Sequence, residues 1–543
     1  MTALDWTVIT IYLAGLITLA ALLARKQKNQ QDYYLAGRKT RWWQSGFSTM
    51  ATQLSAISFV SAPAFVALKE GGGLKWLCYE FGVPLGLLVV IIFIIPVLHR
   101  EGYISIYEYL EGRFNRETRC LVSILFQLGR GLATAVAVLA GGLILSTVLP
   151  ITTLQAIIVI GAVTIIYDAI GGIRVVIISD VIQMIIIIVG IVVCGGAALR
   201  LVGWSNAWET LAPERLSILD FKHWGIHPDG HYGFWPMALG GIFLYASYYG
   251  CDQSQVQREL SVGNVRDVRK SLLFNVFCRY PIVLMYCLVG VFVGAVFMMP
   301  DTFSQLASNL QVEPGTLSEV LRQDPDRMVP MFVLAFLPPG VVGIVFIAVL
   351  SALMSSLDSA INSLSAVTME DYYKVYIKPD ATEKHYLRVS KVLTVFWGIF
   401  SIVAALVFAG ISGARRQTTI VLINAVGSLL YGPILAAFLL GLTVRRIGPF
   451  HAFIGVLSGI ITNILVWRLT EISWLWWNLT GFTSAALVAL LMSFVVGAEV
   501  DLANRNLTRS FRDFISGWKR SYTMVMIYFF LIIIVAYMIQ KIA

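Results

Sequence analysis

Apolar runs of about 20 residues recur along almost the whole chain, and each is long enough to cross a lipid bilayer as a helix. Length and composition identify about fourteen of these runs. They are centred near Ala14, Ser55, Leu87, Ala133, Val159, Ile187, Ala246, Leu284, Ile344, Ala404, Leu430, Val456, Leu487 and Ile532. Charged residues make up only 13% of the 543 positions, and the loops between the runs are short and polar. The sequence therefore predicts an all-α polytopic membrane protein with about 14 transmembrane helices and no separate soluble module.

One run, FIAVLSALMSSLDSAINS (346–363), carries several hydroxyl groups and a carboxylate. Spacings of three and four place these polar residues on one helical face: Ser351, Ser355, Asp358, Ser359 and Asn362. An ionisable group in a membrane helix is costly and is normally retained for a function, and a stripe of hard oxygens suits a small hard cation such as Na+. Small side chains also let helices pack closely, so the spacing alone leaves an ion site and simple packing as alternatives.

Two runs contain polar residues at a depth where a plain membrane helix is apolar. In the second run these residues are Thr49, Thr52, Gln53, Ser55, Ser58 and Ser61, with Pro63 following. In the seventh run, Gly250 precedes Asp252 and Gln253. We expect both helices to be interrupted, because irregular backbone inside a membrane is tolerated where it lines a cavity or site. For each run the alternative is a polar helix end at the membrane interface.

Lys and Arg are concentrated in one set of alternate loops, which predicts that this side is cytoplasmic. The loops are 25–41, 100–119, 258–270, 374–391, 445–446 and 505–520. An even number of spans then places both termini outside the cytoplasm, in a multi-pass protein of the plasma (cell inner) membrane. The net charge of +9 reflects this asymmetry and attraction to anionic lipid of the bilayer, so we expect no nucleic-acid partner.

No constellation typical of an enzyme or of an ATP-driven pump is found in the sequence. It contains no GxxxxGK[ST] phosphate loop, and its six histidines do not cluster. We therefore expect a protein that is not an enzyme and that takes energy for any uphill movement from an ion gradient.

Six ordered motifs resemble the sodium:solute symporter family. They are DYYLAGR (32–38), SIYEYLEGRFN (105–115), YDAIGGIRVVIISDVIQ (167–183), GCDQSQVQR (250–258), SSLDSAINS (355–363) and PILAAFLLGL (433–442). The resemblance implies a leucine-transporter-type core of two inverted five-helix repeats. On that basis we expect an extra N-terminal helix in 1–30, repeat 1 with a broken helix in 31–235, repeat 2 with the second broken helix and the hydroxyl-rich helix in 236–447, and three peripheral helices in 448–543.

The resemblance also implies a sodium site between the second span and the hydroxyl-rich helix. Its oxygens would be the backbone carbonyls of Ala51, Leu54 and Ala352 and the hydroxyls of Ser355 and Ser356. Family members with a second Na+ use positions that correspond here to Asp180, Ser355, Asp358 and Ser359. Asp358 departs from the family, whose members carry a small or hydroxyl residue there. Three roles remain open for it: a ligand of a second Na+, an ion pair with a basic residue such as Arg130 or Arg279, or proton handling.

The likeness to sodium/sugar cotransporters within this family implies a polar solute pocket. Tyr79 and Glu80 match a sugar-contacting pair, Asn424 a glutamine and Ser359 a serine, and Tyr248 matches a gating aromatic. Gln53, Ser55 and Ser58 lie on the polar face of the interrupted helix. Tyr245 replaces the asparagine of the sugar cotransporters, which leaves any particular hexose open. Tyr79 and Tyr245 have interfacial or core packing as the alternative role.

Arg130 lies inside the fourth apolar run, in FQLGRGLATA. Sialic-acid members of the family use an arginine on this helix, because a guanidinium binds a carboxylate through two parallel hydrogen bonds. An intramembrane ion pair or a helix-end role is the alternative.

Taken together, these residues predict a Na+-coupled symporter that imports a small polar organic solute by alternating access. A sugar or polyol is favoured over an organic anion such as sialic acid. A non-transporting sensor on the same fold is a further alternative, although a sensor would be expected to carry an appended signalling domain.

Overall fold

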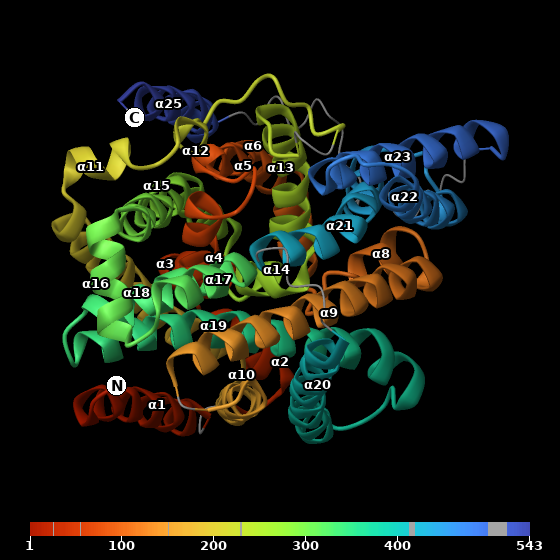
Figure 1. Ribbon diagram of the computed structural model, residues 1–543. Coiled ribbons are helices and arrows are strands. Elements are labelled where there is room, and N and C mark those ends of the chain that lie inside the picture. The colour runs from red at the N-terminus through yellow and green to blue at the C-terminus, as the bar shows by residue number, and fades with distance from the viewer. Residues whose placement is uncertain are drawn as a thin grey trace.

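The computed structural model describes residues 1–24, 27–54, 56–149, 151–227, 231–411, 419–497 and 519–542. Within these ranges the chain forms helices and loops, with a single isolated bridge between Thr40 and Val262 (Figure 1). The long helices are α1 (Ala3–Ala24), α9 (Arg116–Val148), α10 (Thr153–Val202), α13 (Phe234–Cys251), α15 (Val265–Met298), α19 (Val341–Val367), α20 (Glu383–Ile411), α21 (Thr419–Thr443), α22 (Pro449–Leu469), α23 (Trp477–Val495) and α25 (Arg520–Ile542). Shorter helices include α2 (Gln30–Leu35), α3 (Trp42–Gln53), α4 (Ala56–Ala67), α5 (Leu77–Glu80), α6 (Gly82–Val89), α7 (Ile95–Glu101), α8 (Glu108–Arg113), α14 (Gln253–Leu260), α16 (Pro300–Leu310), α17 (Pro314–Gln323) and α18 (Met328–Phe336).

Eleven of the described helical segments are long and apolar enough to cross a membrane, and a bent pair makes a twelfth. This confirms the all-α polytopic class. One segment, α10, has 50 residues and at about 1.5 Å per residue is more than twice the length that a bilayer requires. Its backbone breaks at Gly172, where φ is +57°. Only glycine fits there, because a Cβ would lie 2.6 Å from the ring of Tyr33.

Both helices that the sequence predicts to be interrupted are interrupted. The axes of α3 and α4 meet at 50°, with Leu54 between them in a non-helical conformation. The helix α13 ends at Asp252, whose backbone is extended, and the Asp252 side chain accepts a hydrogen bond of 2.8 Å from the Ser254 amide at the start of α14. These breaks free backbone carbonyls and amides inside the bundle, where a plain helix would use all of them.

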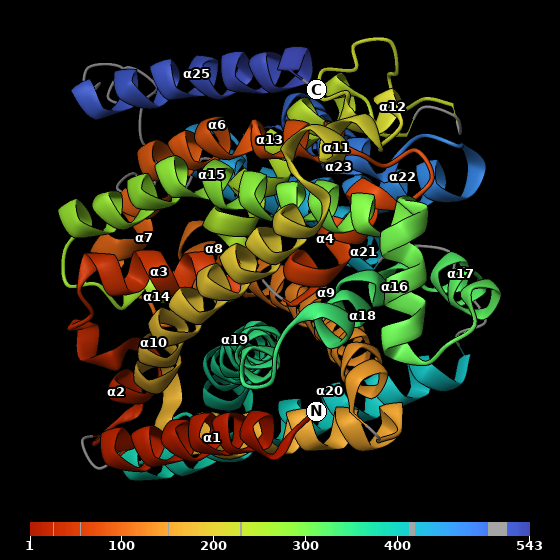
Figure 2. The ribbon, with the colours of Figure 1, turned by 60° about the vertical axis from the view of Figure 1, so that its left-hand side comes forward.

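The hydroxyl-rich helix α19 lies in the middle of the bundle, where Figure 2 shows it almost end-on among its neighbours. It packs against α1, α3, α4, α9, α10, α14 and α20. Its predicted polar stripe is fully enclosed by protein, since Ser351, Ser355, Asp358, Ser359 and Asn362 are at most 1% exposed. The stripe therefore faces other helices and not lipid.

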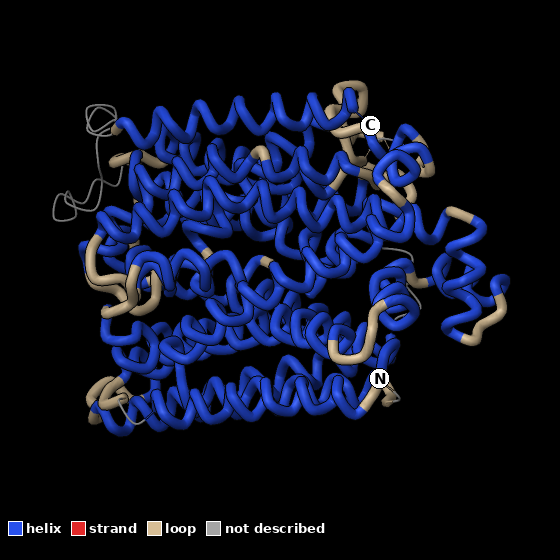
Figure 3. Tube along the Cα trace, turned by 90° about the vertical axis from the view of Figure 1, so that its left-hand side faces the viewer, coloured by secondary structure: helices blue, strands red, loops and turns tan. Residues whose placement is uncertain are grey.

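Most of the long helices run in roughly the same direction through the bundle, and the N-terminus and C-terminus lie at the same end of it (Figure 3). The helix α1 is fixed to this end by Asp5, whose carboxylate accepts hydrogen bonds from the amides of Gly340 (2.7 Å) and Gly343 (2.9 Å) at the start of α19. A carboxylate at this position satisfies amides that a helix N-terminus leaves free.

Candidate functional site

A cavity of about 130 Å³ lies beside the break between α3 and α4, enclosed by α5, α9, α13, α15, α19 and α21. Eight of the nine residues expected to contact solute line it: Gln53, Ser58, Tyr79, Glu80, Arg130, Tyr245, Tyr248 and Asn424. The ninth, Ser55, lies outside the described residues. Ser359, which matches a sugar-contacting serine, does not line the cavity and contacts Arg258 instead. Ten further residues line the cavity that the sequence did not predict to contact solute: Thr52, Trp76, Ala133, Thr134, Ala137, Leu244, Arg279, Tyr286, Ser356 and Tyr431.

Aromatic side chains form much of the cavity wall. The rings of Tyr79 and Tyr245 are 5.6 Å apart, and Tyr248 and Tyr431 are 5.9 Å apart. The Tyr79 hydroxyl has no hydrogen-bond partner among the described residues. Aromatic rings in the cavity wall suit the apolar ring or chain of a compact solute, and the few polar groups among them suit its polar end.

Glu80 is already neutralised within the cavity wall. Arg279 Nε donates to Glu80 Oε2 over 2.9 Å and Nη2 donates to Oε1 over 3.3 Å. The Tyr245 hydroxyl also donates to Glu80 Oε1, at 2.8 Å. This carboxylate is therefore occupied by protein donors, whereas the resemblance to sugar cotransporters implies that it accepts from a sugar. An arginine within the apolar span of α15 was the available signal for this pair.

Arg130 has a looser environment. Its Nη1 donates to the Tyr248 hydroxyl over 3.2 Å and lies 3.7 Å from Asp252 Oδ2. Its Nε has no hydrogen-bond partner in the described part of the chain, although the side chain is only 9% exposed. A buried guanidinium with an unused N–H at a cavity is suited to an anionic group.

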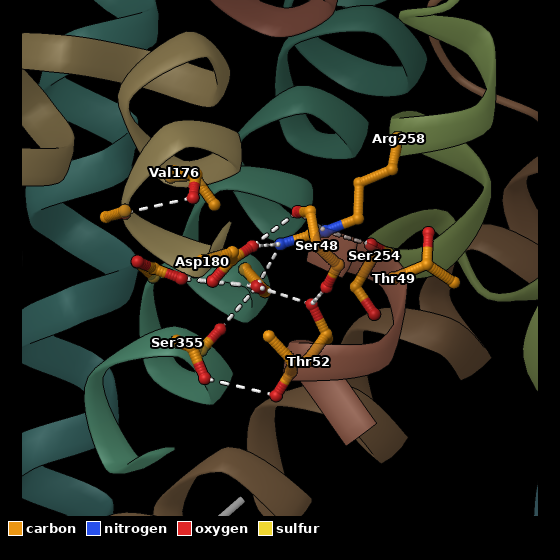
Figure 4. A network of polar contacts seen from close by, with 12 residues as sticks. Ser48, Thr49, Thr52, Val176, Asp180, Ser254, Arg258 and Ser355 are labelled. Carbon is orange, nitrogen blue, oxygen red and sulfur yellow. Dashed lines mark hydrogen bonds and ion pairs between the residues drawn. The ribbon is translucent and has the colours of Figure 1, made fainter. Parts of the chain in front are cut away.

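Four of the five positions expected to bind Na+ come together where the end of α3 faces α19: Ala51, Ala352, Ser355 and Ser356. Figure 4 shows Ser355 of this cluster beside Thr52 at the end of α3. The Ser355 hydroxyl lies 3.2 Å from the Ala51 carbonyl oxygen and 3.3 Å from that of Ala352. The Ser356 hydroxyl lies 3.2 Å from the Ala352 oxygen and 3.3 Å from that of Thr52. Leu54 sits at the break itself and is buried. This cluster of neutral hard oxygens fits a monovalent hard cation.

The positions expected for a second Na+ meet a basic side chain instead. Arg258 extends from α14 and its Nη2 lies 3.0 Å from Asp180 Oδ2 on α10 (Figure 4). The same nitrogen donates to the Ser359 hydroxyl. The sequence predicts that Arg258 begins a loop, which is wrong, because Arg258 lies within helix α14 and is fully buried.

Asp358 pairs with neither of the two arginines proposed for it. Arg279 is bound to Glu80 and Arg130 lies beside Asp252, so that expectation is wrong. Asp358 accepts hydrogen bonds from the hydroxyls of Tyr167 and Ser359. Helical periodicity identified the face that Asp358 occupies but could not identify which helices lie opposite.

A membrane-embedded helical bundle with two interrupted helices around a polar cavity defines a secondary transporter. The sequence model of the sodium:solute symporter family matches residues 33–459, and the chain belongs to this family. A sodium/sialic acid symporter from Aliivibrio fischeri is 27% identical over 499 residues, covering 90% of this chain and 92% of that protein. A sodium/glucose cotransporter from Vibrio parahaemolyticus is 28% identical over 477 residues, covering 84% of each. A solved structure of a Na+-coupled sialic acid symporter superposes with a TM-score of 0.81 at 22% identity, covering 92% of this chain and 99% of that one.

Membership of the family establishes the general activity. The protein is a multi-pass membrane transporter and not an enzyme, it moves a small solute, and Na+ is the coupling ion.

Proposed function

We propose that this protein imports a small organic anion with a carboxylate group together with Na+. The observation that carries the proposal is Arg130, a nearly buried guanidinium on the cavity wall with an unused N–H. The other arginine at the cavity, Arg279, is neutralised by Glu80. Asp252, the acidic partner of Arg130, lies 3.7 Å from it and does not line the cavity. A solute carboxylate could therefore pair with Arg130 more closely than Asp252 does, whereas a neutral solute could not form an ion pair.

A sugar or polyol is the second candidate. Two amide side chains that line the cavity, Gln53 and Asn424, favour it, because amides offer both donors and acceptors to hydroxyl groups. The Tyr249 hydroxyl already donates to Gln53 Oε1 over 3.0 Å, and Glu80 is occupied as described. The organic anion is therefore the better supported of the two.

We assign the coupling Na+ to the oxygens of Ala51, Leu54, Ala352, Ser355 and Ser356. Ser356 and Thr52 line the solute cavity as well as meeting each other at this cluster. An ion bound there would hold the end of α3 against α19 and so fix one wall of the cavity. Na+ and solute would each stabilise the conformation that binds the other, and this coupling is reciprocal.

The architecture that we propose is the leucine-transporter type with about fourteen crossings. Division of α10 at Gly172 into two spans, with the broken pairs α3/α4 and α13/α14 added to the other long helices, supports that count. Repeat 1 (31–235) and repeat 2 (236–447) then each contain one interrupted helix, flanked by 1–30 and 448–543. The distribution of Lys and Arg supports a plasma-membrane orientation with both termini outside.

Comparison of a carboxylate with its carboxamide tests whether the solute is an organic anion. We would measure Na+-dependent thermal stabilisation of the purified protein by a panel of small carboxylates and by the corresponding carboxamides, together with neutral sugars. The wild type should respond to at least one carboxylate and not to its amide. Arg130→Gln should lose that preference, Arg130→Lys should retain part of it, and Arg322→Gln, at an exposed arginine of α17, should behave as the wild type. Stabilisation by a sugar alone, unaffected by Arg130→Gln, would establish the second candidate.

A further inference from the structure

Arg258 is a fully buried arginine that the proposed transport cycle does not use. It belongs to α14, the inner half of the second interrupted helix, and its guanidinium has four polar partners on four elements. Nε donates to the Ser48 hydroxyl on α3 over 2.7 Å, and Nη1 donates to the Ser254 carbonyl within α14. Nη2 donates to Asp180 on α10 and to Ser359 on α19. Burial of a guanidinium is costly unless it is paired and hydrogen-bonded, and here both conditions hold.

The guanidinium lies among oxygens that a second Na+ would need. Asp180 Oδ2 receives Arg258 at 3.0 Å and the Ser48 hydroxyl at 2.5 Å. The Ser359 oxygen accepts from Arg258, and its proton is directed to the Ser355 carbonyl and to Asp358 Oδ1. Two of the four expected ligands are therefore engaged by a fixed cation (Figure 4). A sodium ion bound to the same oxygens would lie against a like charge in a buried site, where repulsion is weakly screened.

We propose that the Arg258 guanidinium is a built-in cation that takes the place of a second Na+, so that each chain binds one Na+. The first sodium cluster is a separate set of oxygens. Arg258 is hydrogen-bonded to Ser48, Ser254, Asp180 and Ser359, none of which belongs to that cluster, and Ser356 of the cluster lines the solute cavity. The number of Na+ ions bound does not depend on the identity of the solute.

The surrounding acidic groups indicate what happens when the guanidinium is removed. Asp180 Oδ1 has no hydrogen-bond partner among the described residues. Asp358 is bound only by hydroxyl donors, and Asp168 accepts from the amide of Asn362. Loss of Arg258 would leave these three buried carboxylates without a fixed cation. A Na+ ion from solution would then bind in the space that the guanidinium occupied.

The test is a count of bound 22Na+ by equilibrium dialysis of the purified protein in nanodiscs, with no solute present. The wild type and Asp358→Asn should each bind one Na+ per chain. Ser356→Ala should bind this Na+ with a much lower affinity. Arg258→Gln should gain a second Na+, and the double variant Arg258→Gln/Asp358→Asn should bind the second ion at least tenfold more weakly. Each variant is first checked for a monodisperse elution profile.

Two Na+ bound by the wild type, reduced to one in Asp358→Asn, would overturn the proposal. A folded Arg258→Gln protein that still binds only one Na+ would also overturn it. If Arg258→Gln does not fold, the counts for the wild type and Asp358→Asn decide alone. Because only Na+ is measured, failure of this proposal is distinguishable from failure of the organic-anion assignment.

Discussion

The Ser356 hydroxyl donates to the Thr52 carbonyl oxygen over 3.3 Å, and both residues line the solute cavity. One belongs to the hydroxyl-rich helix α19 and the other to the last turn of α3, just before the break. This contact joins the proposed Na+ ligands to the cavity wall without an intervening residue. A change in Na+ occupancy can therefore alter the cavity directly, which is the physical requirement for coupling.

Removal of one hydroxyl from the sodium cluster should weaken Na+ dependence without altering the fold. A contact to a charged partner contributes about 1.5–3 kcal/mol, so Ser355→Ala or Ser356→Ala should raise the half-saturating Na+ concentration roughly tenfold or more. The measurement is solute uptake against external Na+. Ser363→Ala is the control, since its hydroxyl bonds only within α19, to the Ala360 carbonyl. Unchanged Na+ dependence in both Ser355→Ala and Ser356→Ala would contradict the assignment of the coupling Na+ to this cluster.

Glu80 and Arg279 should stabilise the folded protein only when both are present. Glu80→Gln leaves a buried guanidinium uncompensated at a cost of about 3–5 kcal/mol, and the double variant Glu80→Gln/Arg279→Gln should recover part of that loss. Thermal unfolding in detergent provides the comparison, with Glu319→Gln as a control because its pair with Arg322 is exposed. Equal stability of wild type and Glu80→Gln would contradict a stabilising ion pair between Glu80 and Arg279.

Asp5 should stabilise the contact between α1 and α19. Asp5→Ala removes the acceptor for the Gly340 and Gly343 amides and should cost about 1–2 kcal/mol, while Asp5→Asn retains an acceptor and should cost less. The same unfolding assay ranks the three proteins. If Asp5→Asn were the less stable variant, a capping role would be contradicted.

The proposed orientation predicts opposite labelling at two segments that lie before and after α19. A cysteine at Thr382, which is exposed after α19, should react with an impermeant thiol reagent only from the cytoplasmic side. A cysteine at Thr316, in α17 before α19, should react only from outside. The loop 505–520 should behave as Thr382 does, although most of it lies outside the described residues. Reversed labelling would invert the topology.

Residue patterns were sufficient for the features that depend on local sequence. The clustered hydroxyls near Thr52 and the glycine and aspartate of the seventh run predicted both interrupted helices, and the hydroxyl spacing predicted the buried face of α19. The residues predicted to contact solute include eight of the eighteen that line the cavity. Patterns failed where a contact joins distant helices. Arg258 was predicted to begin a cytoplasmic loop because it is the first residue of the Lys- and Arg-rich stretch 258–270. Pairing of Asp358 with Arg130 or Arg279 was wrong because periodicity carries no information on tertiary neighbours.

A Na+ gradient across proteoliposomes tests the central claim most directly. Uptake of a radiolabelled panel of small carboxylates, their carboxamides and neutral sugars would be followed with Na+ outside, and again with K+ replacing Na+. We predict that a carboxylate accumulates above its equilibrium level only under the inward Na+ gradient, and that Ser356→Ala reduces this accumulation. With one Na+ and one monoanion per cycle, the rate should not change when valinomycin sets an inside-negative potential. Accumulation of a sugar and of no carboxylate, accelerated by that potential, would contradict the account.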